Sequence, residues 1–206
     1  MKVLLTGFAP FGGETINPSW EVVKQVAQEQ IEGISIIKRQ IPTVFGRSID
    51  EVIEVVTGER PDIVIAVGQA GGRSSISVER VAINVNDARI PDNNGNQPID
   101  VPVIEGGPAA YFSNLPVKAI VKAVNEAGIP ASVSNTAGTF VCNHLMYGIL
   151  HYIEQHKLPI QAGFIHIPYL PQQAVNHRRA PSMSLTDMVS ALRVAVETAV
   201  LNYPGY

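Results

Sequence analysis

A single cysteine stands just before a long apolar pattern with helical spacing. Cys142 follows a small Ala-Gly-Thr turn in the segment 134–144 (SNTAGTFVCNH), and it is the one cysteine of the 206 residues. Free backbone N–H groups and the positive end of the helix dipole favour a thiolate at a helix start. A lone cysteine can equally be an inert buried residue. Cys142 is therefore a candidate nucleophile that needs a partner base.

The candidate base is His166, one of five histidines. His144 lies two residues from Cys142, so on the same helix it points to a different side. His166 ends the apolar run GFIHIP at 163–168, a strand that we expect to reach the same carboxyl edge of a sheet as the cysteine turn. The alternative is a core histidine bonded to the backbone.

An imidazole that acts as a base needs a group to orient it, normally a carboxylate. Glu79, in the sequence Ser77-Val-Glu-Arg80, is the best candidate because Val78 and Val81 flank it. The alternative is a plain ion pair with Arg73, Arg80 or Arg89. No His-Glu-x-x-His motif or Cys/His pairing is present, so we expect neither a metal nor a cofactor.

Two glycine-rich segments are candidate phosphate loops, namely 7–13 (GFAPFGG) and 68–72 (GQAGG). The first lacks the Lys and Ser/Thr of a P-loop, and neither spells G-x-G-x-x-G. The nucleotide signal is weak, but a phosphate- or nucleotide-binding α/β protein stays open as an alternative.

Short apolar runs alternate with helical patterns along the chain. Strands are predicted at 2–6, 34–41, 62–67, 131–135 and 162–167. Helices are predicted at about 18–30, 48–58 and 116–127, from 142 to before Pro159, and at about 184–201. This alternation predicts an open, twisted, mainly parallel α/β sheet with helices on both faces. The segment 77–98, with its turn-rich end PDNNGNQP, predicts a hairpin-bearing excursion in the middle.

Three helix starts carry capping signals. Asn17 precedes Pro18, Ser48 stands three residues before Glu51, and Ser184 begins a Ser-Leu-Thr-Asp sequence. The basic cluster at 177–179 (HRR) is expected in a solvated loop.

Composition excludes several classes of protein. Hydrophobic residues make up 46% and charged residues 16%, which provides a core and argues against disorder. The formal net charge of −3 leaves no basic excess for nucleic acid. No apolar run approaches the roughly 20 residues of a membrane span, and no secretory signal is visible. A single cysteine cannot form an intrachain disulfide, so a cytoplasmic location is expected.

Four segments resemble those of a known family, the pyroglutamyl peptidase I or pyrrolidone-carboxylate peptidase family. ISVERVAIN (76–84) and SNTAGTFVCN (134–143) are similar to the signatures around its catalytic Glu and Cys. LLTGFAPFGGETINPSW (4–20) and GFIHIPYLP (163–171) are similar too, so the resemblance covers the whole chain. It implies one peptidase domain over 1–206, with a phosphorylase/hydrolase-like fold, that removes N-terminal pyroglutamyl residues from peptides.

The resemblance also implies roles for the candidate residues. Cys142 would be the nucleophile that forms a thioester acyl-enzyme, His166 the general base and later acid, and Glu79 the group that orients the imidazole. The backbone N–H of Cys142 is the natural oxyanion donor, and the family implies help from Arg89. A binding module that keeps the pocket without cleaving remains an alternative.

Pyroglutamate is a neutral, flat lactam without a free α-amine, so its pocket needs apolar walls and a few amide partners. The resemblance places eight side chains near the lactam: Phe8, Phe11, Ile90, Phe140 and Val141 as walls, Gln69 and Asn17 as amide groups, and Thr43 close by. The phenylalanines could instead be core residues, and Asn17 only an N-cap. The resemblance further implies a homotetramer, which one cysteine per chain would leave without disulfides.

Overall fold

The computed structural model describes residues 1–204. The strands of its main sheet are β1 (Lys2–Phe8), β2 (Ser35–Ile41), β3 (Ile63–Gln69), β4 (Ile76–Glu79), β7 (Ala131–Ser134) and β8 (Gln161–Ile167). The helices are α1 (Pro18–Val26), α2 (Arg47–Glu59), α3 (Val117–Glu126), α4 (Val141–Gln155), α5 (Pro171–Ala174) and α6 (Leu185–Leu201). Two further strands, β5 (Val81–Ile83) and β6 (Ala110–Phe112), pair with each other.

The main sheet has the strand order β2-β1-β3-β8-β4-β7. Strands β2, β1, β3 and β8 are mutually parallel, whereas β4 runs antiparallel to β8 and parallel to β7. The predicted open, mainly parallel sheet is therefore confirmed. The two reversed strands at one edge were not anticipated, and they decide how the functional residues meet.

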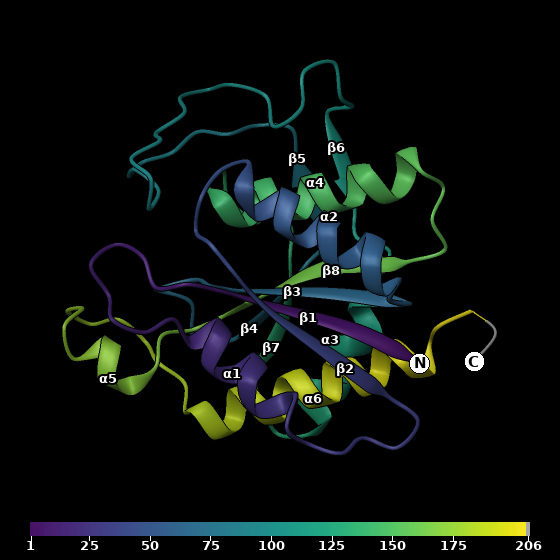
Figure 1. The fold of residues 1–206 in the computed structure, drawn as a ribbon. Helices are drawn as coiled ribbons and strands as arrows, with labels where there is room; N and C mark the ends of the chain where they lie inside the picture. The colour runs from purple at the N-terminus through teal and green to yellow at the C-terminus, as the bar shows by residue number, and fades with distance from the viewer. Residues whose placement is uncertain (205–206) are drawn as a thin grey trace.

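Helices cover both faces of this sheet, as predicted (Figure 1). Helices α1, α3 and α6 lie on one face over side chains such as Val3, Leu5 and Ile65. Helices α2 and α4 lie on the other face over Leu4 and Val64. Because consecutive side chains of a strand point to opposite faces, the nearly continuous apolar runs of β1 and β3 supply both layers.

The capping signals fix two helix starts and miss one. The side chains of Asn17 and Ser184 accept hydrogen bonds from Ser19 N and Asp187 N, as N-caps of α1 and α6. The capping box expected at Ser48 is wrong, because α2 begins one residue earlier with Gly46 as its N-cap. Helix α1 also ends at Val26, four residues before the predicted end.

The middle excursion contains a hairpin, but its second strand lies beyond the predicted segment 77–98. Strands β5 and β6 pair antiparallel, with the long segment 84–109 between them. A single antiparallel bridge, Asn86 with Val101, continues the pairing into that segment. The excursion lies beyond the end of α4 that begins at Val141, so it can contribute to a site there (Figure 1).

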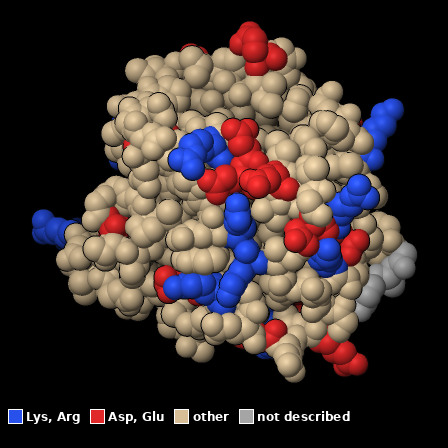
Figure 2. Space-filling model, viewed as in Figure 1, with Lys and Arg blue, Asp and Glu red and all other residues tan. Residues whose placement is uncertain are grey.

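The surface seen in Figure 2 is mostly uncharged, and acidic and basic side chains lie next to one another on it. Arg39, for example, lies 4.0 Å from both Glu51 and Glu54. Within residues 1–204, no helix is long and apolar enough to cross a membrane.

We expect Gly7→Ala to destabilise the fold, because a Cβ at Gly7 would lie 2.7 Å from the backbone N and Cα of Trp20. Helix α1 would have to move, at a cost of roughly 1–3 kcal/mol. Thermal or denaturant unfolding measures the change. Gly58→Ala is the matched control, since nothing lies within 4 Å of its Cβ position. That control should be neutral or stabilising, and equal losses in both variants would contradict the close-packing argument.

Candidate active site

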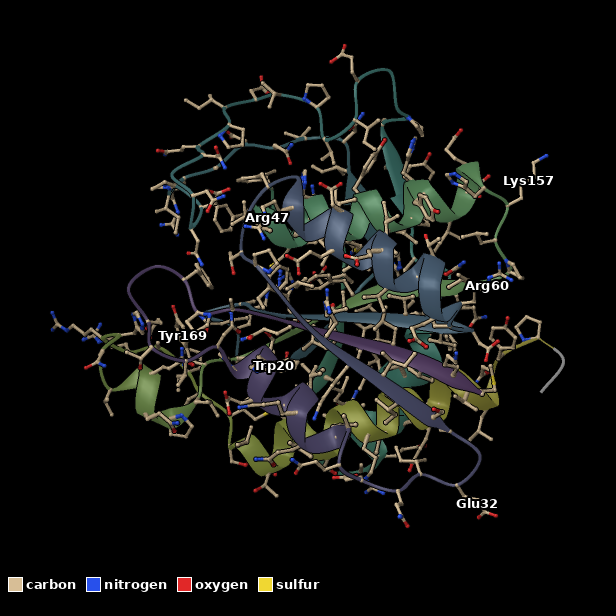
Figure 3. The ribbon with its side chains drawn as sticks, in the orientation of Figure 1. Trp20, Glu32, Arg47, Arg60, Lys157 and Tyr169 are labelled. Carbon is tan, nitrogen blue, oxygen red and sulfur yellow. The ribbon has the colours of Figure 1, made fainter. Side chains whose placement is uncertain are left out.

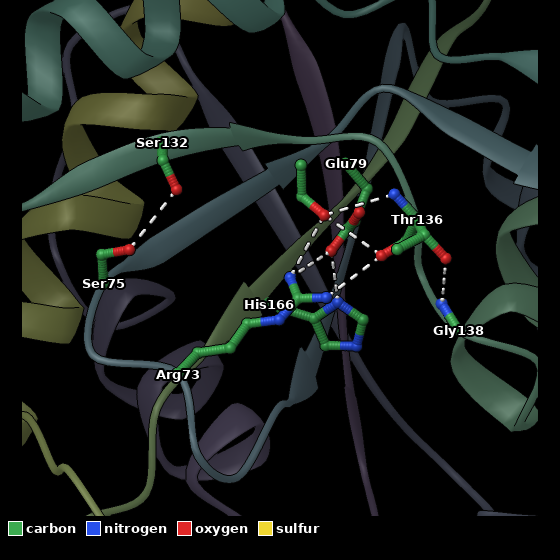
Figure 4. Close-up of polar contacts among 8 residues, drawn as sticks. Arg73, Ser75, Glu79, Ser132, Thr136, Gly138 and His166 are labelled. Carbon is green, nitrogen blue, oxygen red and sulfur yellow. Dashed lines mark hydrogen bonds and ion pairs between the residues drawn. The ribbon is translucent and has the colours of Figure 1, made fainter.

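The carboxylate of Glu79 and the imidazole of His166 form a buried pair across β4 and β8 (Figure 4). Glu79 pairs with Phe164 and Ser77 with His166 in the antiparallel register, so Glu79 and His166 are diagonal neighbours on one face. His166 Nδ1 lies 2.7 Å from Glu79 Oε1, and the two side chains are 4% and 0% exposed. The hydrogen bond that Glu79 would need in order to orient the imidazole is therefore present.

Arg73 binds the same carboxylate. Its Nη1 lies 2.6 Å from Glu79 Oε1, and its Nη2 donates to the carbonyl of Thr136 in the loop before Cys142. The sequence left two alternatives for Glu79, an orienter of the imidazole or a partner of an arginine, and the structure contains both contacts. Arg80 instead donates to Asn135.

The protonation states follow from these contacts. Burial alone raises the pKa of Glu79, but hydrogen bonds from His166, Ser134 and Arg73 outweigh it and lower the pKa. Burial lowers the pKa of His166 despite the nearby carboxylate. At neutral pH the imidazole is therefore neutral and donates Nδ1–H to an ionised carboxylate, which leaves Nε2 free to accept a proton.

Cys142 is the second residue of α4. A Cβ placed on Gly68 would lie 3.0 Å from its Sγ, and Gly68 is the partner of His166 in the β3–β8 register, which locates the thiol over these strand ends. Phe140 is the N-cap and supplies no side-chain hydrogen bond. The backbone N–H groups of the first turn, including that of Cys142, thus lack intrahelical acceptors. Within the described residues, no hydrogen bond joins Sγ to His166.

The electrostatic expectation for Cys142 is wrong in the resting protein. Burial and the charge of Glu79 raise the pKa of Cys142 to about 12, and the opposing effect of Arg73 is smaller. A thiolate in an apolar environment loses its hydration, so burial disfavours the charged form of Cys142. The resting pair is a thiol beside a neutral imidazole.

The route by which the cysteine turn meets His166 also differs from the expectation. Strand β7 is parallel to β4 and therefore antiparallel to β8, so it ends toward the opposite edge of the sheet. The loop that follows β7 returns across the sheet and places the start of α4 over the ends of β3 and β8. The two residues meet through this loop, because the strands do not share a carboxyl edge.

A cleft of about 390 Å³ opens beside these groups. Five of the residues that the resemblance assigns to substrate or oxyanion binding line it: Phe11, Gln69, Arg89, Ile90 and Phe140. The rings of Phe11 and Phe140 are tilted against each other with centroids 6.1 Å apart. These residues come from four separate segments of the chain, so only the fold brings them together.

The other four assigned residues are buried around the cleft. Phe8 packs against Phe164 in the core, and Val141 is fully buried. The side chains of Asn17 and Thr43 both donate to the carbonyl of Ala9, which shapes the turn after β1. Both ends of the Asn17 amide bond the protein, since its oxygen also caps α1.

Glu14, Tyr169 and His177 also line the cleft, although the sequence analysis did not name them as site residues. His177 stacks on Tyr169 with ring centroids 4.5 Å apart, and its Nε2 lies 2.8 Å from Glu14 Oε1. Figure 3 shows Tyr169 beside the turn that follows β1. Residues 177–179 form a loop with Arg178 and Arg179 exposed, as predicted, but the His177 side chain is only 39% exposed and lines the cleft. The partners are 163 residues apart, and no local signal links them.

His144 is structural. Its Nε2 accepts the backbone N–H of Gly46, and its Nδ1 lies 3.0 Å from Asn86 Oδ1. Burial lowers the pKa of His144 to about 4, so the ring is neutral and its one proton points to Asn86. The ring joins the start of α4 to the start of α2 and to the excursion.

Asp92 organises the loop 91–98. Its carboxylate accepts hydrogen bonds from the backbone N–H groups of Asn94, Asn96 and Phe45 and from the side-chain amide of Asn96. Asn93 extends the network to the carbonyl of Pro10. Three segments around the cleft are thereby held together.

An open α/β sheet that places a thiol, an imidazole and a carboxylate beside one cleft is the arrangement of a cysteine peptidase. Among the residues that the structure describes, no group of three His, Cys, Asp or Glu side chains is placed to hold a metal ion. The family model for pyroglutamyl peptidase matches residues 1–202. The chain belongs to the pyroglutamyl peptidase family, and it is a peptidase hydrolase.

Individual relatives agree with this assignment. Pyrrolidone-carboxylate peptidase of Yersinia pestis (strain Pestoides F) is 57% identical over 199 residues, which cover 97% of this chain and 93% of that protein. Pyroglutamyl peptidase I from Bacillus amyloliquefaciens has a similar crystal structure, with TM-score 0.95, 54% identity, and coverage of 98% and 96%. Pyrrolidone carboxyl peptidase from Pyrococcus furiosus has TM-score 0.95, 44% identity, and coverage of 98% and 100%.

We expect Asp92→Asn to lower stability at neutral pH by roughly 1–3 kcal/mol. The side-chain –NH2 of the new asparagine would point at N–H groups that donate to the carboxylate in the wild type. Hydrogen bonds lower the pKa of Asp92 from its ordinary 3.8 against the opposing effect of burial. The stabilisation is therefore present above that value and is lost in acid. Melting temperatures of both proteins against pH should converge as the pH falls. Asn94→Ala is the control, since only the backbone of Asn94 bonds Asp92. A constant difference across pH would contradict the role of the charge.

Proposed function

We propose that this pyroglutamyl peptidase works through a Cys142–His166–Glu79 triad and a thioester acyl-enzyme. The observation that carries the proposal is the buried hydrogen bond between His166 Nδ1 and Glu79 Oε1 beside the strand end that Cys142 covers. It leaves Nε2 as the one basic nitrogen of the imidazole. A neutral thiol with a neutral imidazole needs proton transfer during attack, so His166 acts as a general base.

The acylation step moves one proton twice. His166 Nε2 takes the Sγ proton of Cys142 as sulfur attacks the pyroglutamyl carbonyl carbon. The tetrahedral intermediate then collapses, the C–N bond breaks, and the imidazolium gives its proton to the leaving amine. Glu79 stabilises the imidazolium between these events. The products are a thioester and the shortened peptide.

Deacylation repeats the sequence with water. His166 Nε2 takes a proton from a water molecule whose oxygen attacks the thioester carbon. The C–S bond breaks, the proton returns to Sγ, and pyroglutamate leaves. Both tetrahedral intermediates carry an oxyanion, for which the unbonded N–H of Cys142 at the α4 start is the donor. Arg89, which lines the cleft, is proposed to assist.

The proposed lactam site lies between Phe11 and Phe140, with Ile90 beside them and the Gln69 amide as a polar partner. Gln69 Oε1 accepts from Gln173, so its side-chain amide nitrogen is the group that can serve the lactam carbonyl. Phe8, Asn17, Thr43 and Val141 support this site from behind. Peptides with an N-terminal pyroglutamate are the substrates.

We propose a homotetramer from the family resemblance, and a cytoplasmic location from the single cysteine of the chain. The chemistry is consistent with a reducing compartment, because Cys142 must remain a free thiol for catalysis.

Hydrolysis of a pyroglutamyl-amide reporter is expected, with Cys142→Ala inactive and His166→Ala slower in acylation by about 10²–10⁴-fold. Steady-state and single-turnover rates measure both. Substrates with N-terminal proline or free glutamine are the controls and should be rejected. Unchanged turnover in Cys142→Ala would contradict the proposed mechanism. Binding without turnover by the wild type would favour a silent binding module, and phosphate-dependent protection against unfolding would favour an anion-binding protein.

The raised pKa of Cys142 predicts how the resting enzyme reacts with an alkylating agent. Inactivation by iodoacetamide in the absence of substrate should accelerate continuously from about pH 6 to about pH 10, following the thiolate fraction. A plateau that begins in mildly acidic solution would instead reveal a resting thiolate–imidazolium pair. Loss of the iodoacetamide adduct in Cys142→Ala would confirm that the adduct forms on this cysteine.

A further inference from the structure

Glu79 is an anion in a place where an anion is costly. Its side chain is fully buried, and Oε2 has no hydrogen-bond partner among the described residues. A buried carboxylate takes up a proton unless a cation or strong donors compensate its charge. The charge state of Glu79 therefore depends on its neighbours.

The imidazole of His166 is not that cation in the resting enzyme, because burial keeps its pKa low. The remaining neighbour is Arg73, whose guanidinium lies 2.6 Å from Glu79 Oε1. The charged groups beside the imidazole are thus Glu79 and Arg73, and the thiol of Cys142 lies over Gly68, the strand partner of His166. Arginine stays protonated at all working pH values.

The proton on the imidazole follows from the charge on Glu79. An ionised carboxylate only accepts hydrogen bonds, so it selects the tautomer with a proton on Nδ1 and a free Nε2. A protonated carboxyl group could instead donate to Nδ1, which would move the ring proton to Nε2. That tautomer cannot act as a base toward Cys142.

Arg73 is also fixed at the loop that precedes the nucleophile. Nη2 donates to the carbonyl of Thr136 at 3.0 Å, and Nη1 lies 3.4 Å from the Ser134 hydroxyl (Figure 4). The guanidinium thereby spans the end of β4 and the loop between β7 and α4. Its outer side borders a shallow pocket of serine hydroxyls that includes Ser75 and Ser132.

We propose that Arg73 is a positioning residue that keeps Glu79 ionised and so fixes which nitrogen of His166 is free to accept the thiol proton. It acts through Glu79 and does not touch the substrate. The role rests on the proposed triad, although the effect on the imidazole tautomer can be measured without any catalytic assumption.

The kinetic test compares Arg73→Met, Glu79→Gln and the double variant on the pyroglutamyl-amide reporter. We expect Arg73→Met to lower kcat about as far as Glu79→Gln, with KM little changed, and the double variant to be no slower than either. Losses that multiply in the double variant would overturn the proposal, since independent effects add in free energy. Arg73→Lys should retain part of the rate because it keeps the charge.

A pH profile separates this role from a merely structural one. Removing the cation raises the pKa of Glu79, so the ionised fraction in Arg73→Met falls at neutral pH and grows as the pH rises. Activity of Arg73→Met should therefore recover partly in alkaline solution, and that of Glu79→Gln should not. Arg80→Met is the matched control, because Arg80 is adjacent to Glu79 in sequence and bonds Asn135 instead. It should keep the wild-type rate and profile, and the same profile in Arg73→Met would overturn the proposal.

The imidazole itself gives a readout that does not depend on turnover. Nitrogen-15 NMR of the folded wild type should show His166 with a protonated Nδ1 and a bare Nε2, and Arg73→Met should gain the Nε2-protonated form. An unchanged tautomer in folded Arg73→Met would overturn the proposal. If Cys142→Ala kept full activity, the triad mechanism would fail while this measurement still decided whether Arg73 controls the tautomer.

Discussion

The site depends on one buried oxygen that receives two hydrogen bonds. Glu79 Oε1 lies within 2.7 Å of a nitrogen from both Arg73 and His166, and the carboxylate is shielded completely from solvent. Arg73 compensates the negative charge of Glu79, and this carboxylate holds the imidazole of His166 by a hydrogen bond. Because each contact makes the other favourable, the network orients the candidate base without exposing it to water.

This network is possible because β4 runs against the direction of β8. In an antiparallel pair, residues two positions apart on facing strands lie on one face and within reach of long side chains. Glu79 and His166 are such a pair, while Ile76 and Val78 point to the apolar layer under α3 and α6. Strand β4 thus packs in the core with one face and contributes Glu79 to the site with the other.

Hydrogen bonds join the segments that form the walls of the cleft. Asp92 binds the Phe45 backbone, Asn93 binds the Pro10 carbonyl, and His144 joins α4 to both the α2 start and the excursion. These bonds hold loops that the sequence separates by up to 98 residues. Pre-organised walls allow the substrate to be held without the cost of ordering flexible segments on binding. The stacked Tyr169 and His177 add a wall from the C-terminal part of the chain.

The sequence by itself determined the sheet class, most helices, the catalytic candidates and the family, because these follow from local periodicity, capping residues and long contiguous motifs. Tertiary structure decided what depends on neighbours from distant segments. No local sequence signal predicts the reversal of β4 and β7 or the helix start at Gly46. The same holds for the position of His177 at the cleft and for the carboxylate that Arg73 shares with His166. It also decided the charge states. A helix start alone favours a thiolate at Cys142, but in the packed structure burial and the charge of Glu79 raise the pKa of Cys142 and keep the thiol protonated.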